Sequence, residues 1–298
     1  MPFTGELGTA NSMPENLVPM FGAGGHKFAQ SVNGSLSFTG SIVTAVTRIF
    51  TNVSLTLYRA VYRAYTRWST YPIIVLGDSP VGYWRLGDPS VVTTFDLSGF
   101  KNLGTVRGTV TAGVKGGLLD ATTAMHFDGS TGYITVPLTN ILIPRATFSV
   151  ETIFSFRANA SAVLINEQDS GSTTGFRLAT NGSGGLRAGI NASTLDTANN
   201  LSINTYYHAV VIYDGANVSI YVNGVLAAGP TVLSYTPSSG SFFTIGANEN
   251  GPTLFWNGNL QEVALYNYVL TQQQITNHYT AMTTYPPAGF STNLRTSQ

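Results

Sequence analysis

The residues that could make this chain an enzyme are few and far apart. Cleavage of a glycosidic bond needs two carboxyl groups across the bond, and along one strand such a pair would stand two or four residues apart. Glu262 has Leu260 and Ala264 at its nearest such positions, and Glu151 has no acidic residue at either spacing. The histidines are isolated, and there is no Gly-x-Ser-x-Gly elbow, so a serine triad is not expected. The four histidines are His26, His126, His208 and His278. We therefore predict that the protein is not an enzyme.

The composition is low in charge and lacks cysteine. Charged residues make up 9% of the 298 residues, against roughly 25% in ordinary soluble proteins. The surface must then consist largely of Ser, Thr, Asn and Gly, which suits an all-β protein of a virion or an extracellular surface. The absence of cysteine excludes a disulfide framework, a thiolate metal site and a catalytic thiol. A formal net charge of zero argues against nucleic acid as a partner.

The first seventy residues differ from the rest. Residues 1–34 are rich in Gly and Pro and predict an extended arm, without the basic start and apolar run of a signal peptide. Residues 35–70 contain a weak internal repeat and are basic, and we expect them to anchor or oligomerise the protein. An amphipathic helix on a membrane surface is a second interpretation, whereas the arginines argue against a transmembrane helix. The anchoring candidates are Arg59, Tyr62, Arg63 and Arg67.

From residue 71 onward the sequence shows strands and turns. Residues 73–76 predict a first strand, and alternation along 148–156 places Phe148, Val150, Phe154 and Phe156 on one buried face. Residues 206–213 and 218–222 predict a hairpin. Near the end, Thr271 and Gln274 form the pattern of a capping box and predict the start of a helix. We expect a sandwich domain over 71–284 and a tail over 285–298.

Four short motifs then follow one another in a fixed order. They are VGYWRLGD at 81–88, FDGSTGYI at 127–134, IYVNGV at 220–225 and GNLQEVALYN at 258–267. Together they resemble the laminin-G-like, concanavalin-A-like jelly-roll family over residues 73–282. The resemblance implies an all-β fold, a two-sheet antiparallel jelly-roll sandwich closed by one short helix. The order of this chain, with a basic repeat before the jelly roll, resembles that of phage structural proteins with such a domain.

Members of this family bind glycans, proteins or calcium, so the resemblance implies no single ligand. No cofactor is certain, and Ca²⁺ is the candidate ion. The loop acids Asp88, Asp96 and Asp128 are the metal candidates, although turn formation explains the last two as simply. We assign Trp84 and Trp256 to the core rather than to sugar stacking, and His208 to the core as well.

Three loops, 166–174, 191–200 and 247–253, consist mainly of small polar residues and could form one rim of the sandwich. Amide and hydroxyl groups there are candidates for contact with glycan. The rim candidates are Asn191, Asn248 and Asn250.

The combined expectation is a non-enzymatic virion structural protein, a capsid decoration or fibre component that displays the jelly roll at the virion surface and adheres weakly to glycans. Its expected partners are itself, as a homo-oligomer with a trimer among the candidate states, and other virion proteins. The alternative is a calcium-dependent lectin of a bacterial surface or matrix. The sequence does not distinguish capsid from tail.

Overall fold

The computed structural model describes residues 70–284, apart from 89–90, 121, 145, 170 and 250–252. The chain divides into two units, Met1–Tyr58 and Arg59–Gln298, and all the described residues belong to the second. The predicted arm, the anchoring candidates Arg59, Tyr62, Arg63 and Arg67, and the tail lie outside the described residues.

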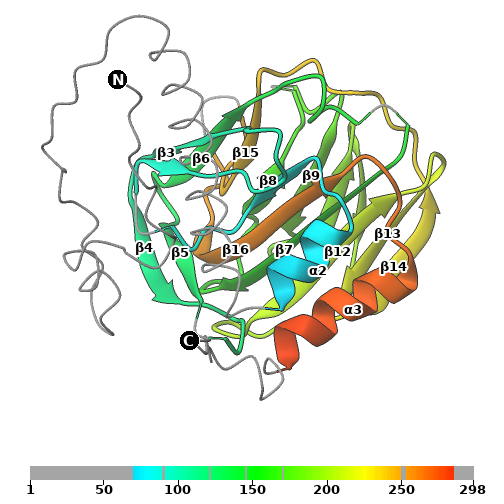
Figure 1. Cartoon of the computed structure of the whole chain (residues 1–298). Helices are drawn as coiled ribbons and strands as arrows, with labels where there is room; N and C mark the ends of the chain where they lie inside the picture. Colours follow the sequence, from blue (N-terminus) through cyan, green and yellow to red (C-terminus); the bar gives the residue numbers. More distant parts are fainter. Residues whose placement is uncertain are drawn as a thin grey trace, which may run out of the picture. The chain divides into compact units, whose positions relative to one another are not determined.

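Two antiparallel sheets form the domain (Figure 1). Sheet A has the order β14-β13-β12-β7-β16-β5-β4, with β1 paired to β16, and sheet B has the order β11-β10-β9-β8-β15-β6-β3-β2. The strands of sheet A are β1 (Gly82–Trp84), β4 (Val110–Lys115), β5 (Thr123–Asp128), β7 (Phe148–Phe156), β12 (Tyr207–Tyr213), β13 (Asn217–Val222), β14 (Val225–Val232) and β16 (Asn257–Tyr266). Those of sheet B are β2 (Thr93–Thr94), β3 (Gly104–Arg107), β6 (Tyr133–Pro137), β8 (Val163–Asn166), β9 (Phe176–Thr180), β10 (Leu186–Ile190), β11 (Ser193–Asp196) and β15 (Phe242–Ile245). The predicted all-β sandwich is confirmed.

The main core lies between the two sheets. All nine residues of β7 are buried, and Phe148, Val150, Phe154 and Phe156 lie in this core, as the alternation predicted. Trp84 and Trp256 are fully buried in the same core, which confirms that neither is a sugar platform. The predicted hairpin is also present, as β12 and β13.

The predicted strand over 73–76 is wrong, because these residues belong to helix α2 (Tyr71–Gly77). Pro72 stands in the first turn, where a helix does not need its missing N–H. Tyr71 and Val75, four residues apart, are buried, whereas Ile73 is 55% exposed. Packing of one helical face therefore outweighs the strand preference of this β-branched run.

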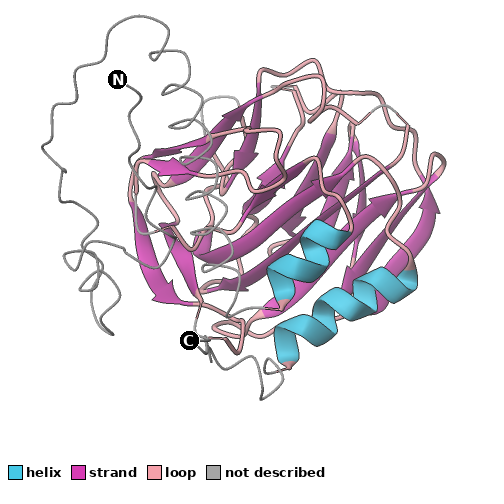
Figure 2. Cartoon of the chain, in the orientation of Figure 1, coloured by secondary structure: helices cyan, strands magenta, loops and turns pink. Residues whose placement is uncertain are grey.

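Helix α3 (Gln272–Thr283) follows the last strand, and its start is the predicted capping box, with Thr271 and Gln274 bonded to each other. Figure 2 shows α2 and α3 on the same side of the sandwich, over the outer face of sheet A. Their buried residues form a second core with Ile153, Val210 and Ala264 of that sheet. Within the described residues, no helix is long and apolar enough to cross a membrane.

Candidate functional site

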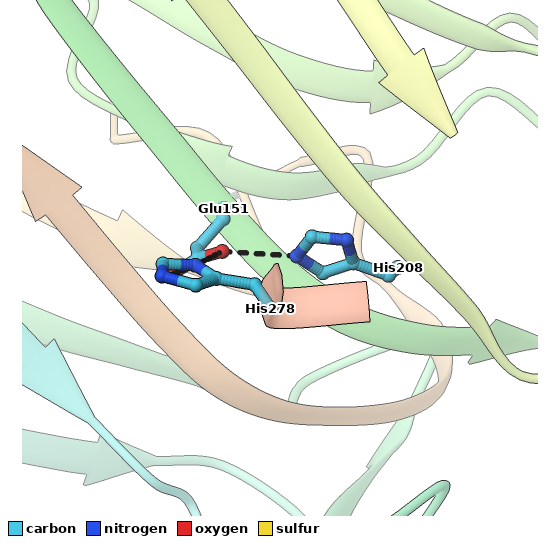
Figure 3. A group of neighbouring side chains, drawn as sticks. All are labelled: Glu151, His208 and His278. Carbon is cyan, nitrogen blue, oxygen red and sulfur yellow. Dashed lines mark hydrogen bonds and ion pairs between the residues drawn. The ribbon is translucent and has the colours of Figure 1, made fainter. Parts of the chain in front are cut away.

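Beneath the two helices, three ionisable side chains from distant parts of the chain meet. Glu151 comes from β7, His208 from β12 and His278 from α3, and all three are fully buried (Figure 3). Nε2 of His208 lies 2.9 Å from Oε2 of Glu151, and Nδ1 of His278 lies 2.8 Å from the same oxygen. The prediction that the histidines are isolated is wrong for this pair, while the core assignment of His208 is confirmed.

Two further side chains complete this cluster. Nε2 of His278 lies 2.9 Å from Oδ2 of Asp78, directly after α2, and the hydroxyl of Tyr266 in β16 donates to Oε1 of Glu151 at 2.6 Å. The five side chains, which we call the helix lock, thus join both helices to three neighbouring strands of sheet A. They are Asp78, Glu151, His208, Tyr266 and His278.

The side chains of the helix lock shift one another's pKa values. Burial favours neutral forms, but His278 and His208 outweigh it and hold the pKa of Glu151 well below its usual range. Burial likewise opposes a charged His278, but the carboxylates of Glu151 and Asp78 outweigh it and raise its pKa to about 9. At neutral pH an imidazolium therefore lies between two carboxylates.

The ligand-type atoms of Glu151, His208 and His278 lie within 4.8 Å of one another, the only such group of three among the described residues. Ligands of a tetrahedral zinc at 2.0–2.1 Å would stand about 3.3 Å apart. The separations here are 2.8 and 2.9 Å, and Nδ1 of His278 faces both oxygens of the carboxylate, at 2.8 and 3.1 Å. These are the dimensions of charge-assisted hydrogen bonds, so protons rather than a metal join the three side chains.

The buried acids of sheet A are unsuited to sugar cleavage. Glu262 is buried and forms a salt bridge with Arg85 at 2.9 Å, and it also accepts a hydrogen bond from Tyr83. Glu151 is enclosed within the helix lock. A glycosidic bond cannot lie between two carboxyl groups that have no exposed surface.

The three calcium candidates lie in separate hydrogen-bonded turns. Asp96 accepts from the backbone N–H groups of Tyr83, Ser98 and Asn102, and Asp128 accepts from those of Ser130, Thr131 and Gly132. Asp88 accepts from the hydroxyl of Thr94 at 2.6 Å. The structure does not bring these carboxylates together, and it uses each of them to hold its own loop.

A different pair of acids has unpartnered oxygens. Glu167, directly after β8, is fully buried, and its Oε1 has no hydrogen-bond partner. Oε2 of Glu249 is buried without a partner as well, while its Oε1 accepts from the N–H groups of Ser241 and Phe242. Burial, with the charge of Glu249 adding to it, raises the pKa of Glu167 to about 8. Neither acid forms a salt bridge with a described residue.

These two acids offer Ca²⁺ carboxylate oxygens that no hydrogen bond occupies, unlike the three predicted acids, which hold their own loops. Calcium takes carboxylate and carbonyl oxygens as ligands. Glu167 and Glu249 would hold the ion. Sequence reasoning missed Glu167, although a carboxylate two residues after the apolar residues 162–165 was a visible signal.

Of the three rim candidates, Asn191 and Asn248 are described, and both amides hold loops. Nδ2 of Asn191 donates to the carbonyl of Ser234 at 2.8 Å, and Nδ2 of Asn248 donates to Oγ1 of Thr253 at 2.8 Å. Asn250 lies outside the described residues. The two described amides therefore bond to different loops.

A cleft of about 430 Å³ lies where β13 and the start of β14 face the segment after β11. Asn200, Leu201 and Tyr207 line it together with Asn223 and Leu226. The side chain of Asn200 is exposed and has no hydrogen bond to another described residue. No Asp, Glu or His lines the cleft, whose surface consists of amide, hydroxyl, aromatic and apolar groups.

The antiparallel two-sheet sandwich agrees with one family of proteins. Residues 128–276, half of the chain, match the family described as the concanavalin A-like lectin/glucanases superfamily. The chain belongs to this superfamily, as the laminin-G-like resemblance predicted. No curated protein matches the sequence.

Solved structures with the same fold come from toxins and a sialidase. The binding domain of Paraclostridial mosquitocidal protein 1 is 14% identical, with a TM-score of 0.54, and the match covers 68% of this chain and 52% of that one. The receptor-binding domain of botulinum neurotoxin mosaic serotype C/D is 14% identical, with a TM-score of 0.54 over 69% and 51%. Trypanosoma rangeli sialidase is 15% identical, with a TM-score of 0.53 over 67% and 32%. The chain thus spans about half the length of the toxin domains that it matches.

Proposed function

We propose that this chain is a non-enzymatic structural protein of a virion whose sandwich domain adheres to glycans through the cleft between β13, β14 and the segment after β11. The observation that carries the glycan proposal is the lining of the cleft. It combines an aromatic ring and aliphatic side chains with amides and lacks any carboxylate or imidazole. Sugars present apolar ring faces and hydroxyl groups, and such a surface is complementary to both.

Within the cleft, Asn200 is the side chain to test. Asn223 accepts a hydrogen bond from the backbone N–H of His208, and the hydroxyl of Tyr207 accepts one from Ser202, so changes there would also disturb the fold. Asn200 has no such structural bond and is exposed. Its amide is therefore free to bind ligand.

A glycan array tests this function. We expect the full chain to give signal on a defined set of glycans, and Asn200→Ala to weaken it at least tenfold, since one or two hydrogen bonds are worth about 1–3 kcal/mol. The control is Asn140→Ala, another exposed asparagine, which lies outside the cleft and whose side chain has no hydrogen bond to a described residue. Equal binding by Asn200→Ala and the unaltered chain would rule out this cleft as the site.

The virion location is supported by the low charge, the absent cysteines and the basic repeat of residues 35–70. In this proposal residues 1–70 attach the protein to a capsid or fibre, with Arg59, Tyr62, Arg63 and Arg67 in contact with the particle or with other copies. Mass spectrometry of purified particles tests this location. We expect the chain in stoichiometric amounts, and particles that lack it entirely would contradict the proposal.

A calcium-dependent lectin is the second candidate function, and the unpartnered oxygens of Glu167 and Glu249 favour it. When bound, Ca²⁺ would cancel the repulsion between these carboxylates and could fix the loops that carry them. Because Glu167 must be ionised to bind the ion, and its pKa is about 8, affinity should rise between pH 7 and pH 9.

Calorimetric titration with calcium chloride tests the second candidate. We expect binding that is at least tenfold weaker in Glu167→Gln and in Glu249→Gln, and unchanged in Asp214→Asn, an exposed acid that holds only its own turn. If the array signal also disappears on chelation, the lectin is calcium-dependent. Absence of heat with the unaltered chain at pH 9 would exclude the calcium site.

A further inference from the structure

Five large apolar side chains are exposed within one short segment of the chain, between β1 and β3. They are Val91 (48% exposed), Val92 (67%), Phe95 (54%), Phe100 (53%) and Leu103 (49%), and we call them the apolar patch. Asp96 in the same segment is buried, so Lys101 is the one exposed charge among the described residues 91–103. So many exposed apolar side chains in one segment are typical of an interaction surface.

The pairing of β2 with β3 brings the two ends of this segment together. Thr94 is paired with Gly104, so Phe95 directly follows one member of the last pair and Leu103 directly precedes the other. At the other end of this pair, the N–H of Val106 donates to the carbonyl of Val92 at 2.9 Å. Phe100 lies in the loop that joins the two strands. The patch therefore lies along β2, the residues just before it and the segment that joins it to β3, at the edge of sheet B.

We propose that the apolar patch is a self-association surface, where two copies of this chain pack their β2–β3 hairpins against each other. The residues of the apolar patch differ from those that line the cleft and from residues 35–70, which the sequence favours for anchoring. A second copy is the occupant that the charge and the area of the patch favour.

The area agrees with what a dimer requires. Side chains of this size have roughly 150–200 Å² of surface each, so the stated exposures give an apolar patch of roughly 450 Å². A standard interface buries about 800 Å² per partner, of which about 57%, or roughly 450 Å², is apolar. The charge agrees as well, because the chain has a formal net charge of zero and copies do not repel one another.

Single cysteines test this arrangement directly, because the natural chain has none. Around a two-fold axis, a residue near the centre of the interface faces its own copy. We expect Phe95→Cys or Phe100→Cys in the full chain to form a covalent dimer with a short bis-maleimide or on oxidation. The control is Val232→Cys, because Val232 is 77% exposed on β14, away from the patch. This variant should remain monomeric under denaturing electrophoresis.

Sedimentation velocity of the full chain provides the second measurement. Phe95→Ser with Leu103→Ser should weaken association at least tenfold, whereas Val232→Ser should leave it unchanged. All five side chains are largely exposed, so the substitutions should change the melting temperature little. A variant that does not fold would be identified by a large loss in melting temperature. Equal association by all the variants together with no cross-linking at Phe95 or Phe100 would overturn the proposal. Patch variants that associate normally but no longer bind particles would overturn it too, because the occupant would then be another virion protein.

Discussion

At the scale of single residues, the chemistry of this chain is enclosed rather than exposed. The carboxylate of Glu151 accepts hydrogen bonds from His208, His278 and Tyr266, and it has no exposed surface. A buried charge is tolerated when it is paired and hydrogen-bonded on all sides. The helix lock therefore has a structural role, which is to hold α2 and α3 against sheet A.

Removal of one partner from the helix lock should destabilise the domain strongly. His278→Ala would leave Glu151 and Asp78 without the imidazolium between them, and breaking such a buried pair typically costs about 3–5 kcal/mol. The matched control is His126→Ala, because His126 is partly buried and its side chain has a hydrogen bond with Asn259 alone among the described residues. This change should cost about 1 kcal/mol or less. Urea unfolding of both variants measures the difference, and equal losses would contradict the role of the helix lock.

The helix lock also predicts how stability depends on pH. The pKa of His278 is raised from 6.5 to about 9, so its contribution is fully present below pH 6.5 and is lost as the pH rises through 9. The pKa of Glu151 is lowered from 4.5, so its contribution is present above pH 4.5 and is lost in acid. The helix lock on its own therefore contributes most near pH 5–6.5, and thermal unfolding of the unaltered chain and of His278→Gln at a series of pH values measures this contribution as their difference. In His278→Gln the decline between pH 7 and pH 10 should be smaller by up to about 3 kcal/mol, and an identical decline in both proteins would refute this assignment.

How far these residues could be predicted depends on their distance along the chain. His208 follows the alternation of an apolar strand, so its burial could be predicted from sequence. Its contact with Glu151 spans 57 residues, and the contact of His278 with Glu151 spans 127. No spacing rule connects such positions, because the sheet order alone brings β7 and β12 side by side and packs α3 over them.

At the scale of elements, the sequence predicts a helix or strand correctly when the interactions that define it join residues close together in the chain. The capping box of α3 and the β12–β13 hairpin depend on residues a few positions apart, and both were predicted correctly. Helix α2 was missed because its apolar run 73–76 is equally consistent with a strand. Only packing of Tyr71 and Val75 against the second core selects the helix.

The capping box offers a test at this scale. Thr271→Ala removes the side chain that accepts from the N–H of Gln274, and loss of such a cap typically costs about 1 kcal/mol. Thr280→Ala, at an exposed position within the same helix, should be neutral or slightly stabilising because alanine is the better helix former. Chemical denaturation distinguishes the two, and a cost no larger for Thr271→Ala than for Thr280→Ala would contradict the capping role.

At the scale of the whole molecule, two buried glutamates of sheet A lie away from the residues that line the cleft. Glu151 and Glu262 lie under α2 and α3 or within sheet A, whereas the cleft beside β14 has only amide, aromatic and apolar lining. The family alone includes both lectins and glucanases, so it does not decide between binding and cleavage. The burial of Glu151 and Glu262 and the lining of the cleft support the binding role that we propose.

Saturation-transfer NMR on a glycan selected from the array tests binding without cleavage most directly. In one sample, kept for a day with the full chain, we expect saturation transfer to the protons of the glycan and unchanged anomeric signals. The transfer should be lost in Asn200→Ala and kept in Asn140→Ala. New reducing-end signals would show that the protein is an enzyme, and absence of transfer with the unaltered chain would show that it does not bind glycan; either result would contradict this account.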